Sequence, residues 1–124
     1  MTIESAYRAR AALNKISHSA MPAKTAYKIS KLSNFLKDDA NFYTERLSQI
    51  IEQYGEKDEN GELVISGSGY KIQKDKTDEC ATAIKELSEI EATVPDAKIY
   101  LSELDGVELS PDDIAAIYAF IEED

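Results

Sequence analysis

The sequence predicts a mainly α protein, an α+β fold, and three observations support this. Apolar residues recur every three or four positions over most of the 124-residue chain, which is typical of amphipathic helices. Around residues 55–74 that period is lost, and turn residues separate short apolar runs. The length is that of one domain. We therefore expect a single domain over residues 1–124: a long antiparallel helical hairpin with flanking short helices and a small β-hairpin or three-stranded meander.

The first predicted helix covers residues 4–18. Ala9, Leu13 and Ile16 recur at spacings of three and four, and alanine is the strongest helix former. Pro22 should separate this helix from the next one, because proline disfavours helix in the residue before it but suits the first turn of a helix.

The second predicted helix is long and runs from Pro22 to a C-terminal cap at Gly55. Its roughly 32 residues would span about 48 Å at a rise of about 1.5 Å per residue, which exceeds what a globular domain of this size needs. We expect this helix to pack against another helix or against a second copy of the chain. The apolar positions of its core face are Ile29, Leu32, Leu36, Ala40, Tyr43, Leu47, Ile50 and Tyr54.

A β-hairpin is predicted at about residues 62–74. Short apolar runs at 63–65 and 70–72 are separated by a turn at 67–69, and Asn60–Gly61 marks a further turn. The aspartates nearby lack the alternating oxygen ligands and the closing glutamate of a calcium loop. We therefore expect a solvated turn and no metal site.

The C-terminal part is predicted to hold two more helices. Residues 75–93 form an antiparallel partner for the second half of the long helix, ended by Pro95. The following run "AKIYLSEL" is extended and could add a third strand to the hairpin, which would turn it into the three-stranded meander. Ser110 and Asp113 fit a capping box at the start of a last helix over about 111–122, whose expected packing face is Ile114, Ile117, Tyr118 and Ile121.

Three segments resemble a known protein family. The step "MPAKTAY", the helix that runs into "IIEQYGEKDENGEL", and "LSELDGVELSPDD" followed by an acidic end occur in this order. In this respect the chain resembles small proteins encoded by tailed phages and prophages, a family with no assigned activity. The resemblance implies a viral protein in the cytoplasm of an infected bacterial host, and it carries over no catalytic residues.

Charge is distributed unevenly along the chain. The formal net charge is −10, yet residues 1–37 hold seven Lys or Arg and one acid. No run approaches the roughly 20 apolar residues of a membrane span, and the N-terminus lacks the layout of a signal peptide. A lone Cys80 also fits a reducing compartment. We expect a cytoplasmic protein with no membrane contact.

Catalytic chemistry has no support in the sequence. His18 has no serine, cysteine or second histidine near it, and Cys80 occupies an apolar position that favours a small core residue. Paired carboxylates such as Asp112–Asp113 are typical of helix caps and solvated ends. We expect no enzyme activity, no catalytic residues and no cofactor.

One helix face is a candidate binding site. At about 100° per residue, lysines and aromatic residues of the long helix fall on one strip, a quarter-turn from the core face. Such a strip can hold a planar anionic ligand by stacking and charge-assisted hydrogen bonds. The alternative is a solvated face whose Phe35 and Phe42 extend the core under the first helix. The candidate ligand- or partner-binding residues are Lys24, Tyr27, Lys28, Lys31 and Arg46.

Three functions remain open on this basis. The first is a non-catalytic phage accessory protein with an anti-defence role, which binds a host component by sequestering a nucleotide immune signal or blocking a host defence protein. The second is a structural or assembly homo-oligomer of the phage. The third is an acidic nucleic-acid mimic that inhibits a host protein. Direct binding to DNA is disfavoured, because the net charge of the chain repels phosphates.

Overall fold

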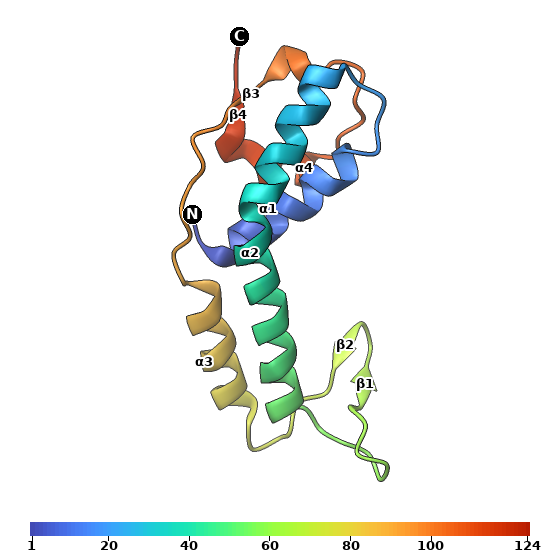
Figure 1. Cartoon of the computed structure of the whole chain (residues 1–124). Helices are drawn as coiled ribbons and strands as arrows, with labels where there is room; N and C mark the ends of the chain where they lie inside the picture. The colour runs from blue at the N-terminus through green and yellow to red at the C-terminus, as the bar shows by residue number, and fades with distance from the viewer.

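The structure is a computed structural model that describes all residues, 1–124, and it confirms the mainly α prediction (Figure 1). Four helices are joined by short strands and two 3₁₀ helices, named η1 and η2. No helix combines the length and the apolar character needed to cross a membrane. The elements are α1 (Ile3–Ile16), α2 (Ala23–Tyr54), β1 (Ile65–Ser66), β2 (Gly69–Tyr70), α3 (Thr77–Ser88), β3 (Ile99–Tyr100), η1 (Leu101–Leu104), α4 (Pro111–Ile117), η2 (Tyr118–Phe120) and β4 (Ile121–Glu122).

The first two helices form where the apolar period places them. Thr2 caps α1, because its hydroxyl accepts a hydrogen bond from the Ser5 amide at 3.1 Å. Pro22 directly precedes α2 and offers no side-chain cap. The 32 residues of α2 form one unbroken helix, as predicted, and its apolar stripe faces other parts of the same chain.

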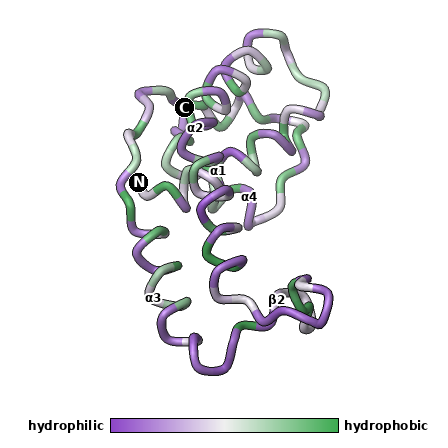
Figure 2. The backbone as a smooth tube through the Cα atoms, turned by 60° about the horizontal axis from the view of Figure 1, so that its bottom comes forward, coloured by the Kyte–Doolittle hydropathy of each residue, from purple (hydrophilic) through white to green (hydrophobic).

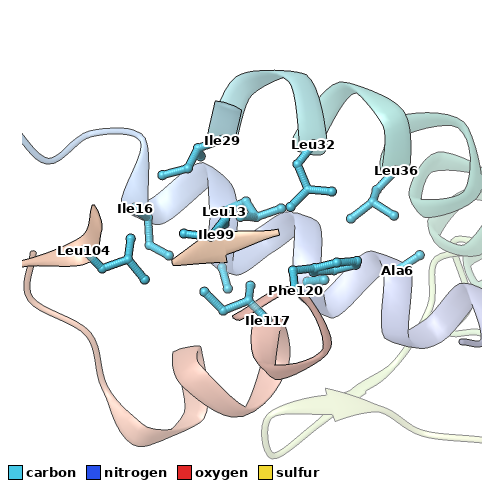
Figure 3. Close-up of a cluster of buried hydrophobic side chains, with 12 residues drawn as sticks. Ala6, Leu13, Ile16, Ile29, Leu32, Leu36, Ile99, Leu104, Ile117 and Phe120 are labelled. Carbon is cyan, nitrogen blue, oxygen red and sulfur yellow. The ribbon is translucent and has the colours of Figure 1, made fainter. Parts of the chain in front are cut away.

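The main core lies between the first half of α2, α1 and the C-terminal segment. Figure 3 shows side chains from all three meeting in one cluster. This packing holds the N-terminal half of α2 on its apolar side, so the adjoining faces of the helix stay free to line a surface. The large fully buried side chains of this cluster are Leu13, Ile16, Ile29, Leu32, Leu36, Ile99, Ile117 and Phe120.

A second, smaller core lies between the other half of α2 and α3. Tyr43 and Ile50 of α2 pack with Cys80 and Leu87 of α3, and Ile3 joins them from α1. The two helices run antiparallel and side by side (Figure 1). The long helix therefore finds packing partners along its whole length within the chain, as α1 and then α3.

The predicted end of the third helix is wrong by five residues. Helix α3 ends at Ser88 instead of residue 93, and Pro95 lies well beyond it. The chain leaves the helix because it pairs with the N-terminus. The Ile3 amide donates to the Ile90 carbonyl at 2.8 Å, and the Ala92 amide donates to the Met1 carbonyl at 2.9 Å.

Of the two predicted forms of the small sheet, the β-hairpin is confirmed and the three-stranded meander is wrong. The hairpin has two strands, with Ile65 opposite Tyr70 and a turn at Gly67, whose φ of +62° favours glycine. The run at 99–100 lies at the other end of the molecule, where β3 pairs with β4 in parallel (Figure 1). The strand is held at that end because the Ile99 side chain is fully buried in the main core.

The last helix starts as predicted and ends early. The Asp113 amide donates to Ser110 Oγ at 3.1 Å, and the Ser110 amide donates to Asp113 Oδ2 at 3.2 Å, which completes the capping box. After Ile117 the chain tightens into η2 and then β4. Of the predicted packing face only Ile117 is fully buried, while Tyr118 is 73% exposed and Phe120 is buried in its place.

Gly55 ends α2 for a different reason than a left-handed cap. Its φ is −67°, which any residue adopts. A Cβ atom at this position would lie 2.5 Å from Leu63 Cδ2 and 2.6 Å from the Ile51 carbonyl oxygen. Glycine is therefore favoured chiefly by the Ile51 carbonyl oxygen of the helix itself, because the tip of the Leu63 side chain can move aside and a backbone oxygen cannot.

Candidate functional site

A groove, which we call the lysine groove, lies between the N-terminal half of α2 and the segment 95–98. Its volume is about 430 Å³, within the range of about 300–1,000 Å³ that is typical of small-molecule sites. It is lined by Lys24, Tyr27, Lys28, Lys31, Leu32, Phe35, Pro95, Asp96, Ala97 and Lys98.

Helix α2 supplies one wall of the groove through its spacing. Lys24, Lys28, Lys31 and Phe35 follow one another at intervals of four, three and four residues, so they lie on one strip of the helix. From the first to the last the strip is about 16 Å long at about 1.5 Å per residue. The strip lies about a quarter-turn from the core face of α2 and adjoins it, since the buried Leu32 also lines the groove.

The C-terminal part of the chain positions the other wall. Pro95 is buried, and Ile99 anchors the following strand in the main core. Lys98 Nζ donates to the Ala119 carbonyl oxygen at 2.9 Å, and the pairing of β3 with β4 continues this attachment. The groove is therefore formed by two segments about 70 residues apart in the sequence, and its width depends on the packing of the C-terminus.

Lys28 is held at the edge of the groove by an ion pair. Its Nζ atom lies 2.6 Å from Glu103 Oε1 and 5.3 Å from the centre of the Tyr100 ring. The hydrogen bond from Lys28 and a second one from the Tyr100 amide lower the pKa of Glu103. Glu103 therefore stays ionised and offsets the charge of Lys28.

The other lysines of the groove have no carboxylate partner. Lys24 and Lys31 are exposed and make no ion pair or side-chain hydrogen bond, and Lys98 contacts a carbonyl oxygen alone. Asp96 is the single acidic residue of the lining. The first turn of α2 also lacks acidic residues, so the positive end of the helix dipole adds to the field of the lysines. The groove is thus positively charged on a protein whose net charge is −10.

Exposed aromatic rings accompany these charges. Tyr27 is 70% exposed and Phe35 is 50% exposed. Phe42, farther along the same strip, is 51% exposed. The expectation that Phe35 and Phe42 extend the core under the first helix is therefore wrong, because α1 covers the neighbouring face of α2 and leaves these rings open to solvent.

Arg46 is the one predicted binding residue that lies outside the groove. It follows Lys31 by 15 residues, which places it about 22 Å farther along the helix. There it hydrogen-bonds Gln49 at 2.8 Å and lines a second hollow of about 380 Å³ between α2 and α3. The structure thus brings together four of the five predicted residues and adds Lys98 and Asp96, which the sequence did not indicate.

The residues considered for catalysis lie apart from the groove. His18 is exposed just beyond the end of α1. Cys80 is buried in the second core, and burial raises the pKa of its thiol. No group of three or more His, Cys, Asp or Glu side chains is arranged to hold a metal ion. The groove itself presents lysine ammonium groups and aromatic ring faces, which are groups suited to binding an anionic, aromatic ligand.

Comparison of the chain with protein-family models, curated proteins and solved structures finds no match. The resemblance to phage proteins therefore stays an expectation from the sequence, and the functional assignment rests on the geometry and charge of the groove.

Proposed function

We propose that this protein is a non-catalytic binding protein whose lysine groove holds an anionic ligand with an aromatic ring, of which nucleotides are the main biological class. One observation carries the proposal: three lysines without a carboxylate partner line an open groove beside two exposed aromatic rings. Lysines left unpaired on an acidic protein are available to an anion from solution.

The two kinds of side chain would hold two parts of such a ligand. Lys24 and Lys31 would donate charge-assisted hydrogen bonds to phosphate oxygens. The ring of Phe35 or Tyr27 would stack on a base, an interaction worth about 1–3 kcal/mol per base in single-stranded nucleic acid binding. The positive field of the groove would also speed the encounter with the anion.

Binding without reaction is favoured by the composition of the lining. It holds no histidine, cysteine, serine or threonine, and its one carboxylate, Asp96, has no second carboxylate or histidine beside it in the lining, so no acid–base pair or activated nucleophile is assembled there. If the resemblance to phage proteins holds, the setting is the cytoplasm of an infected bacterium. Sequestering a host nucleotide signal would then keep that signal from its receptor, and blocking a host defence protein through the same groove is the related possibility.

The proposal is tested by titrating the purified protein calorimetrically with a panel of nucleoside mono-, di- and triphosphates and cyclic dinucleotides. At least one should bind. The double variant Lys24→Glu/Lys31→Glu should weaken that binding by at least about 100-fold, since each lost charge-assisted contact removes about 1.5–3 kcal/mol. Its melting temperature should stay close to that of the wild type, because both side chains are exposed.

Lys37→Glu is the matched control. Lys37 is exposed on the same helix, but it lies about 140° around the helix from Lys24. This variant should keep the wild-type affinity. If none of the nucleotides binds, or if the double variant binds as tightly as the control, the lysines of the groove are only solvated residues and the proposal is wrong.

A further inference from the structure

A small polar hollow, which we call the arginine hollow, lies between α1 and α2. Tyr7, Arg10 and Asn14 line it from α1, and Asn41 and Thr44 line it from α2. The other two lining residues are alanines, whose short side chains leave the space open. The volume of about 190 Å³ equals that of about six water molecules at about 30 Å³ each. It is smaller than the roughly 300–1,000 Å³ of drug-sized sites, so it has room for a small ion or one chemical group.

Two contacts fix the polar edges of α1 and α2 against each other at this hollow. Ser33 Oγ donates to Asn14 Oδ1 at 2.7 Å, and the centres of the Tyr7 and Tyr43 rings lie 5.2 Å apart. Figure 2 shows hydrophilic and hydrophobic residues alternating along the helices, so that polar residues border the packed apolar sides. Since the hydrogen bond from Ser33 uses the amide oxygen of Asn14, the NH₂ group of this side chain remains available as a donor.

Arg10 is the one charged residue of the lining, and its guanidinium lacks an acceptor. Its Nε atom is buried without a hydrogen-bond partner in the protein, and it is the one buried side-chain nitrogen or oxygen for which this holds. The guanidinium forms no ion pair either. Buried polar groups are nearly always hydrogen-bonded, and the planar fork of arginine binds oxyanions through two parallel N–H groups. The acceptor for this fork therefore has to come from solution.

Acidic residues flank the arginine hollow along both helices, but none of them lines it. Glu4 of α1 forms its ion pair with Arg8, at 2.7 Å. Asp38 and Glu45 of α2 are exposed, and the exposed Lys37 offsets one of their two charges. A ligand would therefore be held by short-range hydrogen bonds inside the hollow and not by a long-range positive field.

We propose that the arginine hollow binds a phosphate group. The fork of Arg10 would hold two of its oxygens, and the amide groups of Asn14 and Asn41 would donate to the others. A carboxylate has only two oxygens, which the fork alone would occupy, and these amides would stay without an acceptor. The three or four oxygens of a phosphate group match the donor set better. The group can be inorganic phosphate or the end of a phosphate monoester.

This site is separate from the proposed nucleotide site. No residue lines both the arginine hollow and the lysine groove. Phe35 and Ala40 are the lining residues of the two sites that lie nearest to each other along α2, and they are about 140° apart around the helix. Each site can therefore be disabled without the other, and this inference does not depend on whether any nucleotide binds.

The test is a nuclear magnetic resonance titration of ¹⁵N-labelled protein with inorganic phosphate. The reporters are the side-chain Nε–H signal of Arg10 and the backbone amide signals of Asn41 and Thr44. They should shift together and reach half-saturation at or below about 1 mM, and acetate at equal ionic strength should need at least about tenfold more. The variant Lys24→Glu/Lys31→Glu should give the same response, because its changes lie in the lysine groove.

Methyl phosphate is the probe that distinguishes the two sources of the group. Binding as tight as that of inorganic phosphate would support the site as one for a phosphate monoester. Weaker binding would support it as a site for the free ion, because the added methyl group then does not fit the hollow.

Two variants with matched controls tie the response to the arginine hollow. Arg10→Lys keeps the charge but removes the fork, so phosphate should bind roughly tenfold more weakly. Asn41→Asp puts a carboxylate beside the guanidinium and should weaken phosphate binding by at least about 30-fold. Arg8→Lys and Gln53→Glu make the same chemical changes at exposed positions of the same helices and should keep the wild-type affinity.

The melting temperature of each variant confirms that it is folded, and the exposed Asn41 provides a test even if the half-buried Arg10 cannot be replaced. Reporter signals that do not move with phosphate, acetate that binds as tightly as phosphate, or folded variants that bind phosphate like their controls would each overturn the inference.

Discussion

Replacing Leu36 by aspartate should remove the cooperative thermal transition of the protein. Leu36 is fully buried in the main core, between α1 and the C-terminal segment (Figure 3). An unpaired carboxylate at such a site costs several kcal/mol, which is comparable to the total stability of about 5–15 kcal/mol of a typical domain. The variant should show a flat, low-amplitude melting curve by circular dichroism.

Leu47→Asp gives the matched comparison on the same helix. Leu47 is partly exposed at the edge of the smaller core, so a carboxylate there can reach water. This variant should stay folded with a lowered melting temperature. Should Leu36→Asp melt like the wild type while Leu47→Asp does not, the main core would lie around the other half of α2, contrary to the structure.

Phe120→Ala should lower the free energy of unfolding by about 3–5 kcal/mol, the usual cost of removing a buried phenylalanine ring. Phe120 is fully buried with Leu13, Ile99 and Ile117. Chemical denaturation with urea measures the change. Because the neighbouring Ala119 carbonyl accepts the hydrogen bond from Lys98, the variant should also loosen the wall of the lysine groove.

Tyr118→Ala is the control for Phe120→Ala. Tyr118 is two residues away and 73% exposed, and surface substitutions usually stay within about ±0.5 kcal/mol. Equal losses of stability in the two variants would show that the C-terminal segment does not fold into the core in the described way.

The contrast between these two residues also shows where the sequence misleads. A continued α-helix over 111–122 would place Tyr118 on the packing face with Ile114 and Ile117. The structure changes to a 3₁₀ helix after Ile117, and in that geometry residues three apart lie one above the other. Ile117 and Phe120 therefore face the core together, and Tyr118 is turned out to solvent.

Long-range pairing explains the other differences from the sequence prediction. The positions of α1 and α2 follow from the apolar period, because the pattern that marks each helix lies within its own residues. Helix α3 ends early because residues 90–92 pair with the N-terminus, and the strand at 99–100 pairs with residues 121–122. Such pairings depend on which segments meet in space, and no local pattern of residues reports them.

For the candidate site, too, the sequence predicts the part formed by one helix and misses the part formed by a distant segment. Lys24, Lys28 and Lys31 share a strip of one helix, and helical spacing alone brings them together. Arg46 has the same angular position but lies three turns or more beyond the groove, since an angle around the axis does not limit the distance along it. The second wall, with Lys98, comes from a distant segment that the C-terminal packing brings to α2.

The most direct measurement of the central proposal is a nuclear magnetic resonance titration of ¹⁵N-labelled wild-type protein with the nucleotide that binds most tightly in the panel. If the lysine groove is the site, the amide signals of residues 24–35 and 96–98 should shift progressively and saturate together, while those of the exposed loop at 58–62 stay in place. Signals that do not move, or that move only around Arg46 and α3, would contradict the assignment of the groove.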